Sequence, residues 1–279
     1  MTREKYTPFF LQLIHLVKKG FLQLDETSQK EIRLFIESRQ HINGGFTDRG
    51  GNPDLYYSLF GLWISAALNM DGSLEKLTKF IDRKGKKEKA GIDFFTGFLI
   101  RSFLKGNTFK KPSQLSLVRL FFRESSSINT TYLLFLFLLT FDFFYGKRMP
   151  LLFLVRIILL FYSPPGDSPC SICSAYNVAR VYSGLNVKKQ TRQLFSYFEE
   201  TKGFKIFQNA ENADLLSTAV ALFALQKGNA DLRLVAPDCL HLIQQNYDTG
   251  AFLSGDGDNS RDLEYTFYGL LSLGILSEK

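Results

Sequence analysis

Four carboxylates stand where a side chain could act as an acid, a base or a ligand. Asp54, Asp214 and Asp262 each precede a leucine and a long apolar stretch, and Glu264 follows the last of them. At a helix start, a carboxylate accepts backbone N–H groups that lack a partner and complements the positive end of the helix dipole. In apolar surroundings the same group can instead be kept protonated and donate a proton. Both roles, helix cap and catalytic carboxylate, stay open.

The three aspartates belong to three copies of an internal repeat. Each copy has a glycine, a phenylalanine, a polar loop and then Asp-Leu at the start of an apolar helix. The copies read GGFTDRGGNPDLYYSLFGLWISAAL from Gly44, GFKIFQNAENADLLSTAVALFAL from Gly203 and GAFLSGDGDNSRDLEYTFYGLLSLGIL from Gly250. They span residues 44–69, 203–227 and 250–276. The carboxylates are therefore expected at equivalent places in a repeated unit.

The helices that must position these residues follow from apolar periodicity, which dominates the chain, with almost no alternating runs typical of strands. After a first helix near Tyr6–Lys19, the pattern predicts six pairs, each an amphipathic helix followed by a more apolar one. The amphipathic members are expected near 26–40, 72–83, 111–123, 150–161, 187–199 and 231–246. The apolar members are expected near 54–69, 88–104, 129–145, 170–184, 213–227 and 262–276.

Such a pair cannot bury its apolar helix alone, so repeated pairs must stack side by side. We expect an all-α fold, an α/α toroid (α6–α6 barrel) in which residues 1–279 form one domain with an extra N-terminal helix. The N-termini of the inner helices would meet at one mouth, which favours anions. Nearby cations are Arg49, Lys202, Lys205 and Arg261. The expected aromatic lining is Tyr56, Tyr57, Phe60, Trp63, Phe94, Phe98, Phe135, Tyr176, Phe223, Tyr265 and Tyr268. The alternative is that these rings only fill the core.

The repeats resemble those shared by protein prenyltransferase β subunits and squalene/hopene-type cyclases. The Gly-Gly-Phe and Asp-x-x-Tyr/Thr elements carry the resemblance, which covers about half of the chain. Bacterial prenyltransferase β-subunit-like toroid proteins are the most similar group. The resemblance implies an α6–α6 barrel and an isoprenoid ligand, but no settled substrate.

The zinc site of protein prenyltransferases is not expected. That family holds zinc through an Asp-x-Cys-Tyr-Ser segment and an Asp-x-x-His-Thr segment, and the matching segments here begin at Asp54 and Asp262. Tyr56 stands at the place of the cysteine and Tyr265 at the place of the histidine. A neutral tyrosine is a poor zinc ligand beside a thiolate or an imidazole. The two segments also occur in reversed order. We therefore expect neither metal nor another cofactor at this place.

The cyclase resemblance is also incomplete. Class II cyclases protonate an alkene with the middle acid of an Asp-x-Asp-Asp-Thr-Ala segment, and the corresponding stretch here starts at Asp214. Only that first aspartate matches, because Leu216 stands where the proton donor should be. Asp256 and Asp258 resemble an acid pair only in their sequence, and they are expected in a turn.

One further set of side chains could bind a metal. Cys170, Cys173, Cys239 and His241 have the types found in structural zinc sites. However, Cys239 and His241 are two apart on an expected helix and would face different ways. Buried small side chains are the preferred interpretation of the three cysteines.

Composition narrows the cellular setting. Three cysteines and a start, MTREK, that leads into no apolar signal-peptide core favour a cytoplasmic location. The net charge of +7 comes without a nucleic-acid-binding motif, so no nucleic-acid partner is expected. The most apolar stretch, 132–162, is interrupted by Asp142, the GKRMP segment and Arg156, so it predicts two helices rather than a membrane span. A patch resting on a membrane surface remains an alternative.

These observations favour an isoprenoid-handling toroid that binds a prenyl diphosphate or a similar lipid. The catalytic candidates are Asp54, Asp214, Asp262 and Glu264, and the ligand-binding candidates are Arg49, Tyr56, Tyr57, Trp63, Tyr265 and Tyr268. If it is an enzyme, it is a prenyltransferase-like transferase or an atypical terpene cyclase. The other alternative is a catalytically inactive scaffold that binds a lipid or a protein partner.

Overall fold

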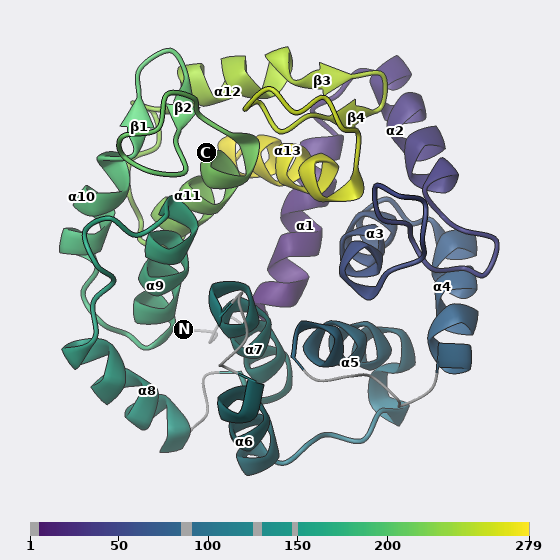
Figure 1. The fold of residues 1–279 in the computed structure, drawn as a ribbon, viewed down its shortest axis with the longest axis horizontal. Coiled ribbons are helices and arrows are strands. Elements are labelled where there is room, and N and C mark those ends of the chain that lie inside the picture. Colours follow the sequence, from purple (N-terminus) through teal and green to yellow (C-terminus); the bar gives the residue numbers. More distant parts are fainter. Residues whose placement is uncertain (1–5, 85–90, 125–129, 147–149, 279) are drawn as a thin grey trace, which may run out of the picture. The chain divides into compact units, whose positions relative to one another are not determined.

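Thirteen α-helices dominate the part of the chain that the computed structural model describes, residues 6–84, 91–124, 130–146 and 150–278 (Figure 1). In chain order the helices are α1 (Phe9–Phe21), α2 (Glu26–Ser38), α3 (Leu55–Ala67), α4 (Asp71–Lys84), α5 (Ile92–Lys105), α6 (Gln114–Glu124), α7 (Thr130–Tyr145), α8 (Pro150–Phe161), α9 (Cys170–Tyr182), α10 (Lys188–Phe195), α11 (Leu215–Lys227), α12 (Ala236–Gln245) and α13 (Leu263–Leu276). A single 3-10 turn, η1 (Gly106–Thr108), follows α5. The mostly helical prediction is confirmed.

Two short hairpins are the main departure from the predicted elements. β1 (Phe198–Glu199) pairs antiparallel with β2 (Gly203–Phe204), and β3 (Tyr247–Asp248) pairs with β4 (Ala251–Phe252). The backbone turns back through residues with positive φ, at 67° for Thr201 and 88° for Gly250. Each hairpin follows an amphipathic helix, so α10 ends before the expected residue 199. Periodicity missed these strands because each has only two residues.

The chain divides into two compact units. Unit 1 comprises Met1–His15 and Ile36–Arg148, and unit 2 comprises Leu16–Phe35 and Met149–Lys279. The boundary falls within α1 and within α2, so each of these helices contributes residues to both units. The closure of all helix pairs into a single toroid domain stays a prediction.

Unit 1 contains a row of apolar helices backed by amphipathic ones. α3 packs on α5, and α5 packs on α7. The amphipathic α4 contacts both α3 and α5, whereas α6 contacts α7. In the core, Phe10 lies against Trp63, with ring centroids 5.6 Å apart. The buried Asp142 of α7 accepts the N–H of Phe9 at 2.6 Å and thereby fixes the start of α1.

Unit 2 has the same two-layer arrangement. α9 packs on α11, and α11 packs on α13, which makes a second row of apolar helices. The amphipathic α10 contacts α9 and α11, and α12 contacts α11 and α13. Both α11 and α13 are buried on nearly all sides, as expected for helices that are apolar all round. The alternation of amphipathic and more apolar helices predicted from the sequence is therefore present within each unit.

Candidate functional site

The three repeat aspartates cap helices in the same way. Each has an extended backbone and lies immediately before an apolar helix, and one carboxylate oxygen accepts the N–H of the residue three positions further on. The pairs are Asp54 with Tyr57 at 3.0 Å, Asp214 with Ser217 at 2.7 Å and Asp262 with Tyr265 at 2.9 Å. The helix-cap interpretation is therefore correct for all three, and any catalytic role would be additional.

A buried phenylalanine completes each repeat. Its N–H donates to the side-chain hydroxyl of the residue four positions after the aspartate. This hydrogen bond joins the hairpin or β-bridge that contains the phenylalanine to the apolar helix. The bonds run from Phe46 to Ser58 Oγ at 3.0 Å, from Phe204 to Thr218 Oγ1 at 3.1 Å and from Phe252 to Thr266 Oγ1 at 3.3 Å. All three phenylalanines are fully buried. This shared geometry shows that the three copies are one structural unit used three times.

The phenylalanine ring needs a small residue on the helix. A Cβ atom on Gly61 would lie 2.3 Å from Phe46 Cδ2, and one on Gly269 would lie 2.4 Å from Phe252 Cγ. The second repeat has Ala221 at this position. Sequence reasoning missed both the hydroxyl and the small residue. The signal was present, because both recur at fixed distances after the aspartate.

In unit 1, a second carboxylate lies within electrostatic reach of Asp54. Asp93 is an exposed residue in the first turn of α5, and partial desolvation together with the negative charge of Asp54 raises its pKa. The exposed Arg49 lies in the loop before Asp54. Asp93 was not among the sequence candidates, although its position in a first helical turn could have suggested it.

Half-exposed aromatic side chains lie close to this end of unit 1. Tyr56 and Tyr57 have ring centroids 5.3 Å apart, and Tyr56 packs edge-on against Phe60 at 5.1 Å. On α5, Phe94 and Phe98 stack at 5.6 Å. All of these rings except Phe60 are partly accessible. These two groups of rings, one on α3 and one on α5, could each contact an apolar ligand.

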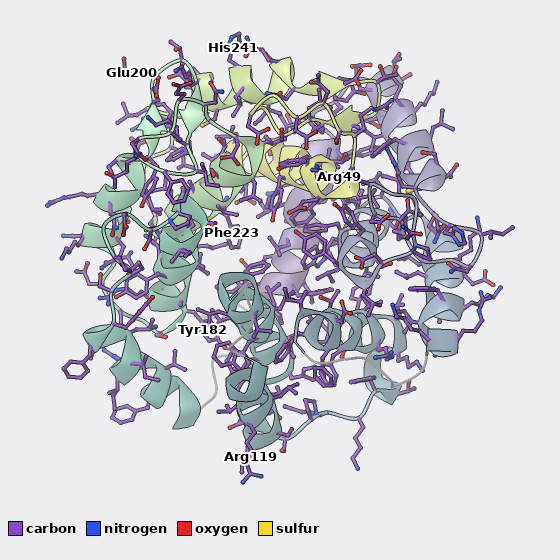
Figure 2. All side chains as sticks on the ribbon, in the orientation of Figure 1. Arg49, Arg119, Tyr182, Glu200, Phe223 and His241 are labelled. Carbon is purple, nitrogen blue, oxygen red and sulfur yellow. The ribbon has the colours of Figure 1, made fainter. Side chains whose placement is uncertain are left out.

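Other predicted lining residues are core residues. Trp63 is fully buried and contacts Phe60 with centroids 5.7 Å apart. In unit 2, Phe223 of α11 (Figure 2) and Tyr268 of α13 are also buried, and Tyr176 donates to the main-chain oxygen of Leu159 in α8. Their packing is explained without a ligand, and their role in binding one stays a prediction.

Unit 2 contains a second carboxylate cluster, around Asp214. This side chain is 8% exposed, and its Oδ2 has no hydrogen-bond partner among the described residues. Burial raises the pKa of Asp214, the hydrogen bonds from Ser217 oppose that shift, and the charge of Asp256 adds to it. Such a group has the character of a proton donor.

Tyr265 lies among the carboxylates of this cluster. Burial raises its pKa, and the negative charges of Glu264, Asp256, Asp214 and Asp262 raise it further. The phenol therefore stays neutral at pH 7. The loop that carries Asp256 is held by the Leu215 N–H, which donates to Ser254 O at 2.7 Å.

The cations expected at the rim of unit 2 are engaged with acids. Lys202 and Lys205 pair with Glu199 at 2.7 Å and 2.9 Å. Arg261 lies 3.7 Å from an Asp248 oxygen and also donates to the carbonyl of Thr249. The N-termini of α11 and α13 are already capped by carboxylates. The electrostatic potential at these helix starts is therefore less favourable for an anion than the cations in the sequence implied.

The cysteine and histidine set does not assemble. Cys239 is buried, whereas His241 lies on the outer side of α12, where it bonds Gln245 at 2.8 Å (Figure 2). Cys173 contacts the Tyr197 hydroxyl at 3.3 Å. Within the described ranges, no group of three or more His, Cys, Asp or Glu side chains is arranged to hold a metal ion. Burial raises the pKa of all three thiols, consistent with inert core residues.

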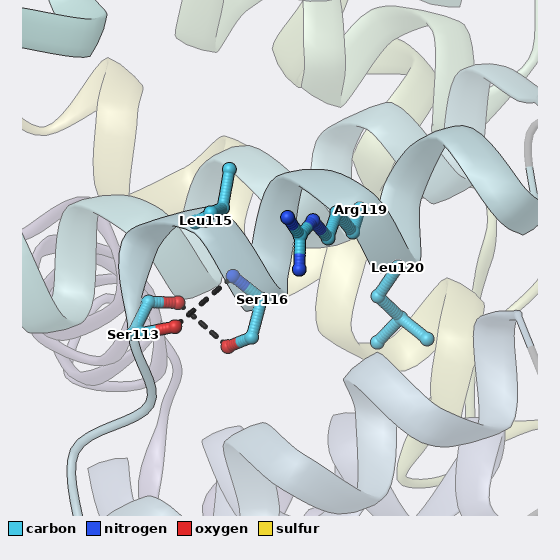
Figure 3. A pocket seen from close by; sticks show the side chains of 5 residues that line it. All are labelled: Ser113, Leu115, Ser116, Arg119 and Leu120. Carbon is cyan, nitrogen blue, oxygen red and sulfur yellow. Dashed lines mark hydrogen bonds between the residues drawn. The ribbon is translucent and has the colours of Figure 1, made fainter.

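A small surface pocket lies along α6 (Figure 3). Its volume is about 280 Å³, and it is lined by Ser113, Leu115, Ser116, Arg119 and Leu120. Ser113 Oγ accepts the N–H of Ser116 at 3.1 Å, an ordinary helix-start contact. The lining comes from one turn-and-helix segment and includes none of the predicted site residues.

Comparisons with protein-family models, with curated proteins and with solved structures gave no match. The site must therefore be judged by its own chemistry. It offers capped helix starts, clustered carboxylates and partly exposed aromatic rings. Among the described residues, no helix is long and apolar enough to cross a membrane.

Proposed function

We propose that the chain binds an isoprenoid lipid and lacks the zinc chemistry of the protein prenyltransferases. The observation that carries the proposal is the geometry shared by the three repeats, the same segments that resemble prenyltransferase and cyclase repeats. The α/α toroid expected from those repeats is part of the proposal. The partly accessible rings of Tyr56 and Tyr57 on α3 and of Phe94 and Phe98 on α5 would contact the prenyl chain, since branched apolar chains pack well on aromatic rings.

The polar end of the ligand is constrained by charge. Asp54 at the start of α3 raises the pKa of Asp93 at the start of α5 through its negative charge, and Asp54 already accepts an N–H group of the first turn of α3. A diphosphate would be repelled there by about 1 kcal/mol for each nearby carboxylate in a largely aqueous setting. An uncharged end, such as a prenyl alcohol, avoids that cost. Arg49 is the side chain that would favour a diphosphate instead.

A second candidate function rests on Asp214 in unit 2. A buried carboxyl group with a raised pKa and an unused Oδ2 could protonate an alkene, as in an atypical terpene cyclase. Incubation with prenyl substrates followed by gas chromatography and mass spectrometry tests this. Cyclic products that disappear in Asp214→Asn would support it, and their absence in the wild type would reject it.

Native mass spectrometry of the purified chain tests the main proposal. A bound species with the mass of a prenyl lipid, lost on extraction with an organic solvent, is the expected result. Reloading the stripped protein with geranylgeraniol should restore the same mass shift. A chain that neither carries nor takes up a prenyl lipid would favour the inactive scaffold that binds a protein partner.

A further inference from the structure

Helix α8 exposes a large apolar surface. Phe161 is 88% exposed and Phe153 is 65% exposed, and Ile157, Ile158, Leu160 and Tyr162 are also open to solvent. In the rest of the described chain, exposed large hydrophobic side chains are mostly isolated. These six lie within ten consecutive residues, 153–162. A contiguous patch of this kind marks an interaction surface.

Four of the six exposed apolar residues occupy one side of the helix. At about 100° per residue, Phe153, Ile157, Leu160 and Phe161 fall within roughly 100° of the circumference. Arg156 lies at the edge of that arc and is exposed. Leu159 lies on the opposite side and is buried. α8 is thus apolar on nearly all sides, and one of these sides faces outwards with the cation of Arg156 beside it.

Polar contacts hold α8 in this orientation. Its helix neighbour in unit 2 is α9 (Figure 1), and two side chains of α9 reach its last turn. Tyr176 donates its hydroxyl to Leu159 O at 3.1 Å, and Arg180 Nη1 donates to the same oxygen at 2.7 Å. The helix is therefore fixed through its backbone, which leaves its apolar side available.

Charge indicates what covers this side. Between Asp142 and Asp167 the sequence has three cations, Lys147, Arg148 and Arg156, and no carboxylate. An apolar helix face that carries an exposed arginine and no carboxylate of its own matches a bilayer surface that contains anionic lipids, where apolar burial and attraction to lipid phosphates act together. At 12 residues α8 is too short to cross a bilayer and suits a position in the interface plane.

We propose that α8 docks the protein on the surface of an anionic lipid bilayer, with Phe153, Ile157, Leu160 and Phe161 in the acyl region and Arg156 among the headgroups. This inference is independent of the prenyl ligand, because it rests on a different helix and on exposure rather than on the repeats. It identifies α8 as the patch in the sequence-based alternative of a protein that rests on a membrane surface.

Vesicle co-sedimentation of the full chain tests the proposal. The wild type should bind phosphatidylcholine vesicles that contain phosphatidylglycerol, bind pure phosphatidylcholine vesicles more weakly, and dissociate as salt rises. The double variant Phe153→Ser/Phe161→Ser should lose at least about tenfold in partitioning. The matched control Ile42→Ser/Leu234→Ser removes two apolar side chains that are 98% and 79% exposed elsewhere, and it should bind like the wild type.

Fluorescence quenching tests directly whether α8 enters the bilayer. In Phe161→Trp, brominated lipids should quench the new fluorescence, whereas the buried Trp63 of the wild type should be little affected. The proposal is overturned if the wild type does not bind anionic vesicles, or if both double variants lose binding equally. It is also overturned if the wild type self-associates through α8 without binding vesicles, because a second copy would then cover this face.

Discussion

The hydroxyl of Tyr176 donates a hydrogen bond to the main-chain oxygen of Leu159, 3.1 Å away. This contact joins the middle of α9 to the last turn of α8, where helix carbonyl groups have no partner within their own helix. Arg180 binds the same oxygen at 2.7 Å. Together they tie a helix with a mostly exposed apolar side to the rest of unit 2.

Tyr176→Phe should loosen α8 while leaving the fold intact. The variant loses hydrogen bonds worth about 1 kcal/mol each. Hydrogen–deuterium exchange should therefore rise in the peptide that covers α8, by up to about fivefold for each 1 kcal/mol lost. Tyr162→Phe, which removes a hydroxyl from a half-exposed ring, is the control and should leave the exchange unchanged. Equal protection of α8 in both variants would show that the bonds from Tyr176 do not hold the helix.

Gly269→Ala should destabilise the protein because the new Cβ would lie 2.4 Å from Phe252 Cγ. We expect a loss of about 1–3 kcal/mol in the free energy of unfolding, as is usual for overpacked cores. Urea denaturation measures it. Gly72→Ala is the control, because nothing lies within 4 Å of that Cβ position in α4, and it should stabilise by up to about 1 kcal/mol. Similar effects of both substitutions would contradict the conclusion that the Phe252 ring needs a residue without a side chain at position 269.

Asp214→Asn should change how stability depends on pH. Burial raises the pKa of Asp214 above its ordinary value of 3.8, so the folded state binds this proton more tightly than the unfolded state. Its contribution to stability is present below pH 3.8 and is lost as pH rises through the folded-state pKa. The stability of the asparagine variant relative to the wild type should therefore increase as pH rises from 3.8 through the folded-state pKa.

Chemical denaturation at several pH values measures this difference. Asp54→Asn is the matched control, since it replaces the equivalent cap of α3 and separates the effect of burial from that of losing a carboxylate. A relative stability of Asp214→Asn that stays constant or falls with rising pH would contradict a raised pKa.

Purified protein should contain far less than one zinc per chain. Tyrosines stand at the positions where the resembled transferases have their thiolate and imidazole ligands, and burial with nearby carboxylates keeps Tyr265 neutral. Inductively coupled plasma mass spectrometry measures the metal content. About one tightly held zinc per chain, lost in Asp54→Ala but kept in Asp71→Ala, would contradict the account.

Sequence reasoning placed the helices well because their signals are strong and local. The three Asp caps stood before long apolar runs, and every expected helix range has a helix in the structure. The two hairpins were missed because two-residue strands carry no periodicity. Their positions depend on contacts such as the one from the Phe252 N–H to Thr266 Oγ1, which joins residues 14 apart.

The candidate site was harder to predict than the fold. Carboxylate positions followed from the repeats, but the burial of Asp214 depends on how α9, α11 and the loop around Ser254 pack. The pairing of Lys202 and Lys205 with Glu199 also arises from the hairpin, which the sequence did not reveal. The nearby cations in the sequence therefore overstated how attractive unit 2 is to an anion.

Calorimetric titration with two prenyl ligands tests the central claim most directly. Geranylgeraniol, delivered from cyclodextrin, should bind with a Kd below about 100 μM. Geranylgeranyl diphosphate should bind more weakly, and only its affinity should fall in Arg49→Ala. Tyr56→Ala should weaken both ligands, whereas Phe207→Ala, which removes a partly exposed ring in unit 2, should weaken neither. If neither ligand binds at about 100 μM, the protein does not handle isoprenoids as proposed.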